Sequence, residues 1–263
     1  MTIQYLSDEE YENIFVSFCS FRQKLVSKLE EYGLLKSNYI MDLAAGHGFL
    51  SFAVKEKGYK NYLVDIGLIN DLENFRRTIA IETYNSRNLQ FIVMDSSKMA
   101  FRENRFDFIV NFLGLEDINM TIGKSGVIST LKEADRILKV GGILEIAILA
   151  KGSKPSSILN WKIWKYIGLN SRFYSPEFYI NKMLELGLRL KEKFMLRTNK
   201  KMTSTQAKEE ILFACEEAPK IFKRYNVYPK PFKQVWNKYK KKIKKQGLGF
   251  YPIILILIFE KQS

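Results

Sequence analysis

The stretch YIMDLAAGHGFLSF, residues 39–52, places an acid, four small residues and the chain's one histidine between two apolar runs. Small residues let the backbone approach a ligand closely, and a helix that begins after such a turn presents free N–H groups. Asp65 stands 17 residues after Gly48, at the end of the next apolar run. A carboxylate at that place can accept hydrogen bonds from both hydroxyls of a ribose, so the spacing predicts a nucleoside site.

Other interpretations of these residues stay open. A nicotinamide-dinucleotide fold would also place glycines and a ribose acid here, and Gly46-x-Gly48-x-x-Ser51 half-fits its glycine pattern, although a lone match of that kind is weak. The glycines could serve only the tight turn, and an acid at a strand end is often a helix cap. His47, as a lone histidine, is more simply a side chain that packs over the loop or donates a hydrogen bond than an acid–base catalyst.

The elements that must position this turn alternate between strand and helix. Buried apolar runs predict strands, and apolar residues at steps of three and four predict helices. The predicted strands are 39–43, 61–65, 89–94, 107–112 and 143–149, and the predicted helices are 8–32, 49–57, 70–84 and 126–139. This alternation predicts a parallel α/β sheet, in which ligands collect at the carboxyl ends of the strands.

After residue 150 the pattern changes. Residues 151–174 carry two tryptophans and predict a helical excursion, and Ser175-Pro176-Glu177 is a strong helix start. Further elements are expected as a strand over 188–196, helices over 204–217 and 231–246, and a last strand over 252–260. Within the last of these helices, an apolar stripe at helical spacing is expected to pack inward; it consists of Phe232, Trp236, Tyr239 and Ile243.

Four motifs in order resemble those of class I S-adenosylmethionine-dependent methyltransferases. DLAAGHG, from Asp42, stands where the family has D-L-G-x-G-x-G, and NYLVD is similar to its second strand ending in an acid. The run from Asp95 to Asp107 resembles D-x-x-x-L-P-F-x-x-x-x-F-D, and the run from Glu133 to Gly142 resembles E-x-x-R-V-L-K-P-G-G. The resemblance covers residues 38–149 and implies a Rossmann-like, doubly wound sheet of seven mostly parallel strands with an antiparallel last strand. An N-terminal helix and helical insertions complete the expected fold.

The resemblance implies S-adenosyl-L-methionine as the cofactor and a role for each matching residue. Asp42 would order the loop and face the methionine amino group, Gly46 and Gly48 would give the cofactor room, and Asp65 would bind the ribose. The remaining residues implied in cofactor binding are Ala44, His47, Asp95, Ser96 and Asn111. Ala44 replaces the family's first glycine, a change expected to be tolerable if this residue has ordinary backbone angles.

Methyl transfer requires the acceptor atom, the methyl carbon and the sulfur to be held in line with water excluded. Asn111, at the end of the fourth strand, is expected to lie closest to the methyl group. A general base is needed only if the acceptor arrives protonated, and Glu116 and Asp117 are the candidates for it. The strand ends Asn-Phe-Leu-Gly and does not resemble the N-P-P-Y type of amino-group methylases of adenine or glutamine, and no cysteine lies near it for a cytosine-C5 mechanism, so these acceptors are disfavoured. Small-molecule, protein and some RNA acceptors remain, with a small molecule or protein favoured.

The charge of the chain is distributed unevenly. Residues 1–150 hold 17 basic and 20 acidic side chains, whereas residues 151–263 hold 25 and 8, within a net charge of +14. Residues 218–249 contain 11 basic side chains and no acid. This stretch predicts a surface that selects an anionic acceptor, RNA or an acidic protein. The alternatives are a solvated lysine face, and a scaffold that binds RNA or an acidic partner without turnover.

The remaining composition bounds the class of protein. The 263 residues suit a single methyltransferase domain over 1–263, with an N-terminal helical region over 1–37 and a cofactor-binding core over 38–150. Helical parts are expected over 151–175 and 199–249, the second being a basic insertion before the last strand at 250–260. Two distant cysteines and one histidine give no support for a metal site or disulfides. No run is long enough to span a membrane and the first residues are polar, so a cytoplasmic protein is expected.

Overall fold

The computed structural model describes residues 21–45, 49–59, 62–66, 90–169, 174–198, 200–217, 219–220, 226–250 and 253–263. The predicted helix over 70–84, the first part of the predicted helix over 8–32, and Gly46, His47 and Gly48 lie outside the described residues. Residues 21–31 are helical, in agreement with the second part of the first predicted helix.

Within the described residues, seven strands form one sheet in the order β3-β2-β1-β4-β5-β9-β6. The neighbours from β3 to β5 are parallel, and β9 runs antiparallel to both β5 and β6. The strands are β1 (Ile40–Asp42), β2 (Tyr62–Ile66), β3 (Gln90–Val93), β4 (Phe106–Phe112), β5 (Leu138–Leu149), β6 (Leu188–Arg197) and β9 (Ile253–Lys261). The predicted fold class, a Rossmann-like α/β sheet with an antiparallel last strand, is confirmed.

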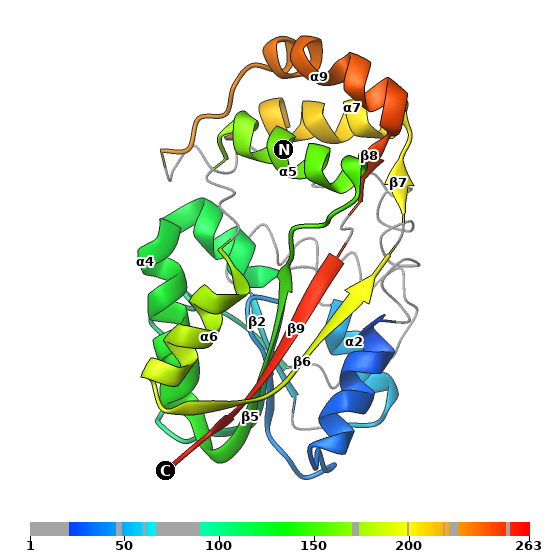
Figure 1. Ribbon diagram of the computed structural model, residues 1–263. Coiled ribbons are helices and arrows are strands. Elements are labelled where there is room, and N and C mark those ends of the chain that lie inside the picture. The colour runs from blue at the N-terminus through cyan, green and yellow to red at the C-terminus, as the bar shows by residue number, and fades with distance from the viewer. Residues whose placement is uncertain are drawn as a thin grey trace.

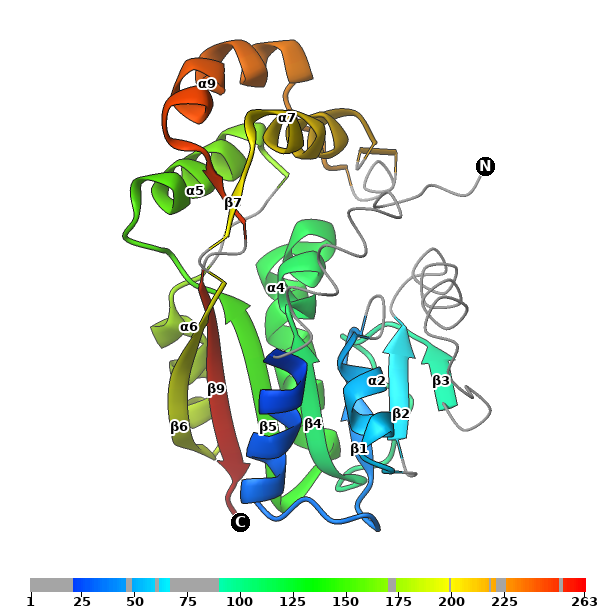
Figure 2. The ribbon, with the colours of Figure 1, turned by 90° about the vertical axis from the view of Figure 1, so that its right-hand side faces the viewer.

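Helices cover both faces of the sheet (Figure 2). On one face, residues 21–31 and α2 (Phe49–Glu56) pack on an apolar cluster that includes Ile40, Val110 and Ile143. On the other face, α4 (Gly114–Ile137) and α6 (Pro176–Glu185) pack on a second cluster. The two clusters are separate because successive residues of a strand point to opposite faces.

Two predicted boundaries needed correction. The helix predicted over 126–139 is the second part of α4, which begins at Gly114 and bends at Gly123, where φ is 72°. The strand predicted over 143–149 begins five residues earlier, at Leu138. The strand continues past the glycine pair because Gly141 adopts a φ of 75°, in the left-handed region open to glycine.

The two predicted helical parts after residue 150 pack against each other. They form a third apolar cluster, and we call this unit the helical cap. It consists of α5 (Pro155–Ile167), β7 (Lys201–Met202), α7 (Ser204–Leu212), the π-helical turn η2 (Phe213–Glu217), α9 (Phe232–Gln246) and β8 (Leu248–Gly249). Figures 1 and 2 both show the cap beyond the carboxyl ends of the parallel strands, where ligands of this architecture collect.

The apolar stripe predicted in α9 does face the interior of the cap. Tyr239 and Ile243 are buried, together with Val235, which the prediction missed, and Phe232 and Trp236 pack against the same cluster. The lysines of α9 are left on its outer side.

In the described part of the chain, no helix has the length and apolar character needed to cross a membrane. The expected cytoplasmic location stays a prediction.

Candidate functional site

The described residues that the sequence proposed for the site come from neighbouring strands of the sheet. Asp42 ends β1, Asp65 lies near the end of β2, and Asn111 lies near the end of β4. Asp95 and Ser96 follow the end of β3. Because the sheet order is β3-β2-β1-β4 and these strands are parallel, all four strand ends meet at one edge. The structure describes the backbone of Asp65 but not its side chain.

Asp42 ties the first strand to the helix that follows it. Its side chain is 1% exposed, and its Oδ2 accepts a hydrogen bond of 2.7 Å from Oγ of Ser51, which is fully buried in the first turn of α2. This bond fixes where α2 begins relative to β1. It supports the predicted loop-ordering role of Asp42. Ser51 appeared in the sequence only as part of a half-fitting glycine pattern, and nothing there identified its partner.

Asn111 holds the same loop from the other side. Its Nδ2 donates a 2.7 Å hydrogen bond to the carbonyl oxygen of Leu43, and the Leu43 N–H donates to the Val110 carbonyl at 2.8 Å. The Asn111 side chain is buried, and its Oδ1 has no hydrogen-bond partner among the residues that the structure describes. The side-chain nitrogen of Asn111 is therefore occupied by its hydrogen bond to the loop. Contact between Asn111 and a methyl group stays a prediction.

Ala44 does not have ordinary backbone angles, so the condition under which an alanine was expected to be tolerable here is not met. Its φ is 52°, in the left-handed region that costs a residue with a Cβ about 1–2 kcal/mol. Leu113, just after β4, has a φ of 63°. A Cβ on Gly114 would lie 2.5 Å from the Ala44 carbonyl oxygen and 2.8 Å from Asn111 Nδ2. Only glycine at 114 lets the two turns approach this closely. Strained backbone of this kind concentrates at functional sites.

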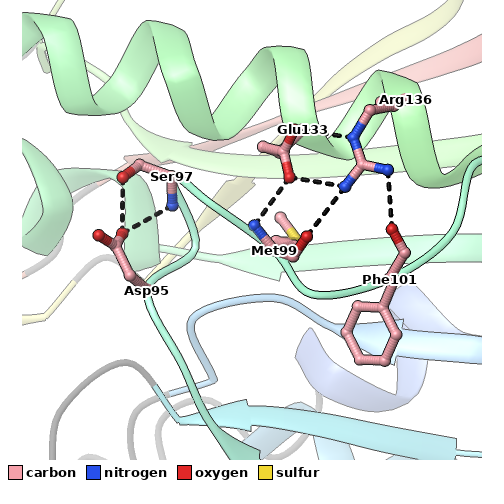
Figure 3. A network of polar contacts seen from close by, with 6 residues as sticks. All are labelled: Asp95, Ser97, Met99, Phe101, Glu133 and Arg136. Atoms are coloured by element: carbon pink, nitrogen blue, oxygen red, sulfur yellow. Dashed lines mark hydrogen bonds and ion pairs between the residues drawn. The ribbon is translucent and has the colours of Figure 1, made fainter.

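The loop after β3 is held by the fourth sequence motif (Figure 3). Arg136 donates to the carbonyl oxygens of Phe101 at 2.7 Å and Met99 at 3.0 Å, and it forms a two-pronged ion pair with Glu133. Glu133 also accepts the Met99 N–H at 2.7 Å. The Arg136 guanidinium lowers the pKa of Glu133. The E-x-x-R pair of α4 thus fixes the loop that carries Asp95 and Ser96.

Asp95 shapes its own turn. Its Oδ1 accepts hydrogen bonds from the backbone N–H and the hydroxyl of Ser97, at 2.8 and 2.6 Å, while the residue as a whole is exposed. One of the two Asp95 carboxylate oxygens therefore caps the local turn, which is the structural role that the sequence left open for this acid. Ser96 beside it is buried. An adenine contact by this turn stays a prediction.

The two candidate bases lie in the first turn of α4 and differ in environment. Glu116 Oε1 accepts the Leu149 N–H at 2.7 Å, which joins α4 to the end of β5, and its Oε2 is enclosed without a hydrogen bond among the described residues. Burial of this carboxyl, aided by nearby Asp117, raises the pKa of Glu116 to about 8. Asp117 is exposed.

The sequence analysis missed a buried acid on β5. Glu145 is 1% exposed and lies within a strand that is otherwise apolar, ILEIAIL. Burial, together with the charge of Asp42, raises the pKa of Glu145 to about 8. The one signal in the sequence was this single acid in a run of large apolar residues.

The described part of the site leaves two buried polar atoms that a ligand with hydrogen-bond donors could satisfy. Asn111 Oδ1 and Glu145 Oε2 are buried and accept no hydrogen bond from any described residue. Buried polar atoms are nearly always hydrogen-bonded in folded proteins, so these two are candidates for contact with a ligand. They lie on β4, which pairs with β1, and on β5, the next strand beyond β4. Among the described residues, no group of His, Cys, Asp and Glu could hold a metal ion.

The family model of a methyltransferase domain matches residues 12–193. The chain therefore belongs to the methyltransferase domain family, and the resemblance to class I methyltransferases is confirmed. It is 29% identical over 137 residues to the ubiquinone/menaquinone biosynthesis C-methyltransferase UbiE of Azotobacter vinelandii, covering 52% of this chain and 51% of that protein. It is 28% identical over 139 residues to the putative methyltransferase YqeM of Bacillus subtilis, covering 50% and 53%. The chain spans about half the length of these curated relatives.

Solved structures agree on the fold. A putative methyltransferase from Bacillus halodurans has a TM-score of 0.60 at 16% identity, covering 91% of this chain and 99% of that one. A phosphoethanolamine N-methyltransferase from Haemonchus contortus, solved with phosphomonomethylethanolamine and S-adenosylhomocysteine, has a TM-score of 0.52 at 14% identity, covering 90% and 52%. At such identities the likeness shows the fold alone.

The left-handed conformation of Ala44 makes a direct prediction for stability. Ala44→Gly removes the Cβ penalty, whereas Ala45→Gly, at a residue without positive φ, relieves no such penalty and loses a methyl group that packs against the core. Both changes add a glycine to the unfolded chain, so this entropic cost cancels in the comparison. We expect the free energy of unfolding in urea to be about 1–2 kcal/mol higher for Ala44→Gly than for Ala45→Gly. Equal values for the two variants would contradict the strained turn.

The raised pKa values of Glu116 and Glu145 predict a pH dependence of stability. Both carboxyls have an ordinary pKa of 4.5, so between about pH 5 and 8 the folded protein holds protons that the unfolded chain has released. Stability therefore falls as the pH rises through this window. Urea unfolding of Glu116→Gln and Glu145→Gln across the window should show a shallower fall than the wild type. Curves parallel to the wild type would show that these carboxyls titrate normally in the folded protein.

Proposed function

We propose that this protein is an S-adenosylmethionine-dependent methyltransferase. The observation that carries the proposal is the loop after β1, which Asp42 joins to α2 through Ser51 and Asn111 joins to β4, at the shared carboxyl edge of the strands. Membership of the methyltransferase family and the motif series support the same conclusion.

The cofactor supplies an activated methyl group on a sulfonium. The protein's own contribution is then to fix the two reacting groups in line and to exclude water, which is worth several orders of magnitude in rate. Asp65 would hold the ribose, Asp95 and Ser96 would flank the adenine, and Asp42 and Asn111 would position the loop beneath the ligand. Gly46, His47 and Gly48 belong to this loop in the sequence.

Glu116 is the better of the two candidate bases. Its carboxyl lies in the first turn of α4, at the end of β5, and its pKa of about 8 lies near the pH at which a general base exchanges protons efficiently. This role is needed only for an acceptor that arrives protonated.

The acceptor would be selected by the helical cap. The cap lies beyond the carboxyl ends of the parallel strands (Figure 1). Met120 of α4 packs against the apolar cluster of the cap. We favour a small molecule or a protein as the acceptor.

A second candidate function, methylation or binding of RNA, rests on α9. Seven lysines and no acid lie in this helix of 15 residues, and within the described residues none of these lysines forms an ion pair. Like charges at three- and four-residue spacing repel one another, which lowers helix stability unless a polyanion binds. The apolar side of α9 is turned into the cap, which leaves a purely electrostatic outer surface suited to phosphates.

The proposed function makes a binding prediction. We expect calorimetry to show binding of S-adenosylhomocysteine and none of NAD. Asp65→Ala should weaken S-adenosylhomocysteine binding by about 1–3 kcal/mol, the cost of leaving polar partners unmatched. Asp117→Ala, an exposed residue in the first turn of α4, is the matched control and should keep the wild-type affinity. Binding of NAD alone would overturn the proposal.

The α9 surface makes a separate prediction. Reversal of Lys241, Lys242 and Lys245 to Glu should abolish retention of a labelled short RNA while S-adenosylhomocysteine binding persists. The affinity of the wild type for RNA should fall steeply as salt is raised. Reversal of Lys24, Lys132 and Lys193, which are exposed on the core, changes the net charge equally and should leave RNA retention unchanged. If both triple variants retain RNA to the same extent, the lysines of α9 form only a solvated face and the RNA proposal is contradicted.

A further inference from the structure

Glu145 lies in one row with Asp42 across three neighbouring strands. Asp42 of β1 is in register with Val110 of β4, and Val110 is in register with Glu145 of β5. Residues in register on adjacent strands point to the same face of a sheet. The two acids therefore project from the same face, on either side of Val110, at the level where β1 ends.

Among the described residues, no cation forms an ion pair with Glu145. Its neighbours on this face are apolar, among them Ile143, Ala147 and Ile258. Among the described residues, no group donates to Glu145 Oε2, which is shielded from solvent.

A buried carboxyl without a partner is costly unless it is protonated or meets a cation. The charge of Asp42 and the burial of Glu145 both favour the protonated form, which accounts for a pKa near 8. At neutral pH the Glu145 carboxyl is thus mostly protonated in the absence of ligand. A cation placed beside the two acids would reverse this preference, because it stabilises both carboxylates.

We propose that Glu145 and Asp42 together bind the ammonium group at the amino-acid end of the ligand, and that Glu145 releases its proton to solvent when this group binds. The inference rests on the proposed function, since S-adenosylmethionine and S-adenosylhomocysteine both carry that ammonium. The family resemblance implies Asp42 alone for this contact, and the structure adds Glu145. The step is balanced: one carboxylic acid becomes a carboxylate, and its proton passes to the buffer.

The test is calorimetry of S-adenosylhomocysteine binding at pH 7 in two buffers of different ionisation enthalpy. The wild type should release up to about one proton, and the release should vanish above a pH of about 8, where Glu145 is already ionised. Glu145→Gln should release none and should bind S-adenosylhomocysteine about tenfold or more weakly. Asp135→Asn, which removes a carboxyl that has a raised pKa and no assigned role at the site, is the matched control and should release protons as the wild type does.

A second ligand separates ammonium recognition from general damage. 5′-Methylthioadenosine has the same nucleoside and thioether but no amino-acid end, so its affinity should be equal for the wild type and Glu145→Gln. Thermal melting confirms that the variant is folded, and the pH dependence of proton release in the wild type needs no variant at all.

The outcomes are distinct. Proton release that is unchanged in Glu145→Gln, absent in the wild type, or accompanied by equal loss of affinity for both nucleosides overturns the role of Glu145. If the wild type binds neither nucleoside, the proposed function fails and this inference fails with it.

Discussion

The hydrogen bond from Asn111 to the carbonyl of Leu43 is the interaction on which the site depends. It joins the loop after β1 to the end of β4 at 2.7 Å, while Asp42 and Ser51 join the same loop to α2. Between these anchors Ala44 is held in a left-handed conformation against Gly114. The strain is small compared with the packing of the sheet, and it places the loop backbone at the edge where four strand ends meet.

The acidic and basic side chains of the site and the cap lie on different parts of the molecule. The strand ends gather acids, of which Asp42 and Glu145 are buried, so this edge favours a ligand with a positive group. The cap beyond it carries the lysines of α9 on its outer side, so it favours a negative partner. A cofactor with a cationic end and an acceptor with anionic character would thus be attracted to different surfaces of one protein.

The sequence predicted the sheet and its helices because their signals are local. Apolar runs and helical spacing lie within single elements, and the motif series implied the Rossmann-like sheet with its antiparallel last strand. The left-handed angle of Ala44 was missed because it arises from contact with Gly114 on a distant turn. Glu145 was missed because its meaning comes from the register of β1, β4 and β5, and the union of α5 with α7 and α9 comes from tertiary packing.

The account's central claim is that a nucleoside with an amino-acid end lies across the carboxyl ends of β1 and β2, above the loop that Asn111 and Asp42 hold. A crystal structure of the protein with S-adenosylhomocysteine tests it most directly. The account predicts the ribose beside Asp65, the amino-acid end beside Asp42 and Glu145, and an unchanged bond between Asn111 and Leu43. A nucleoside bound elsewhere, or strand ends filled by the protein's own side chains, would contradict it.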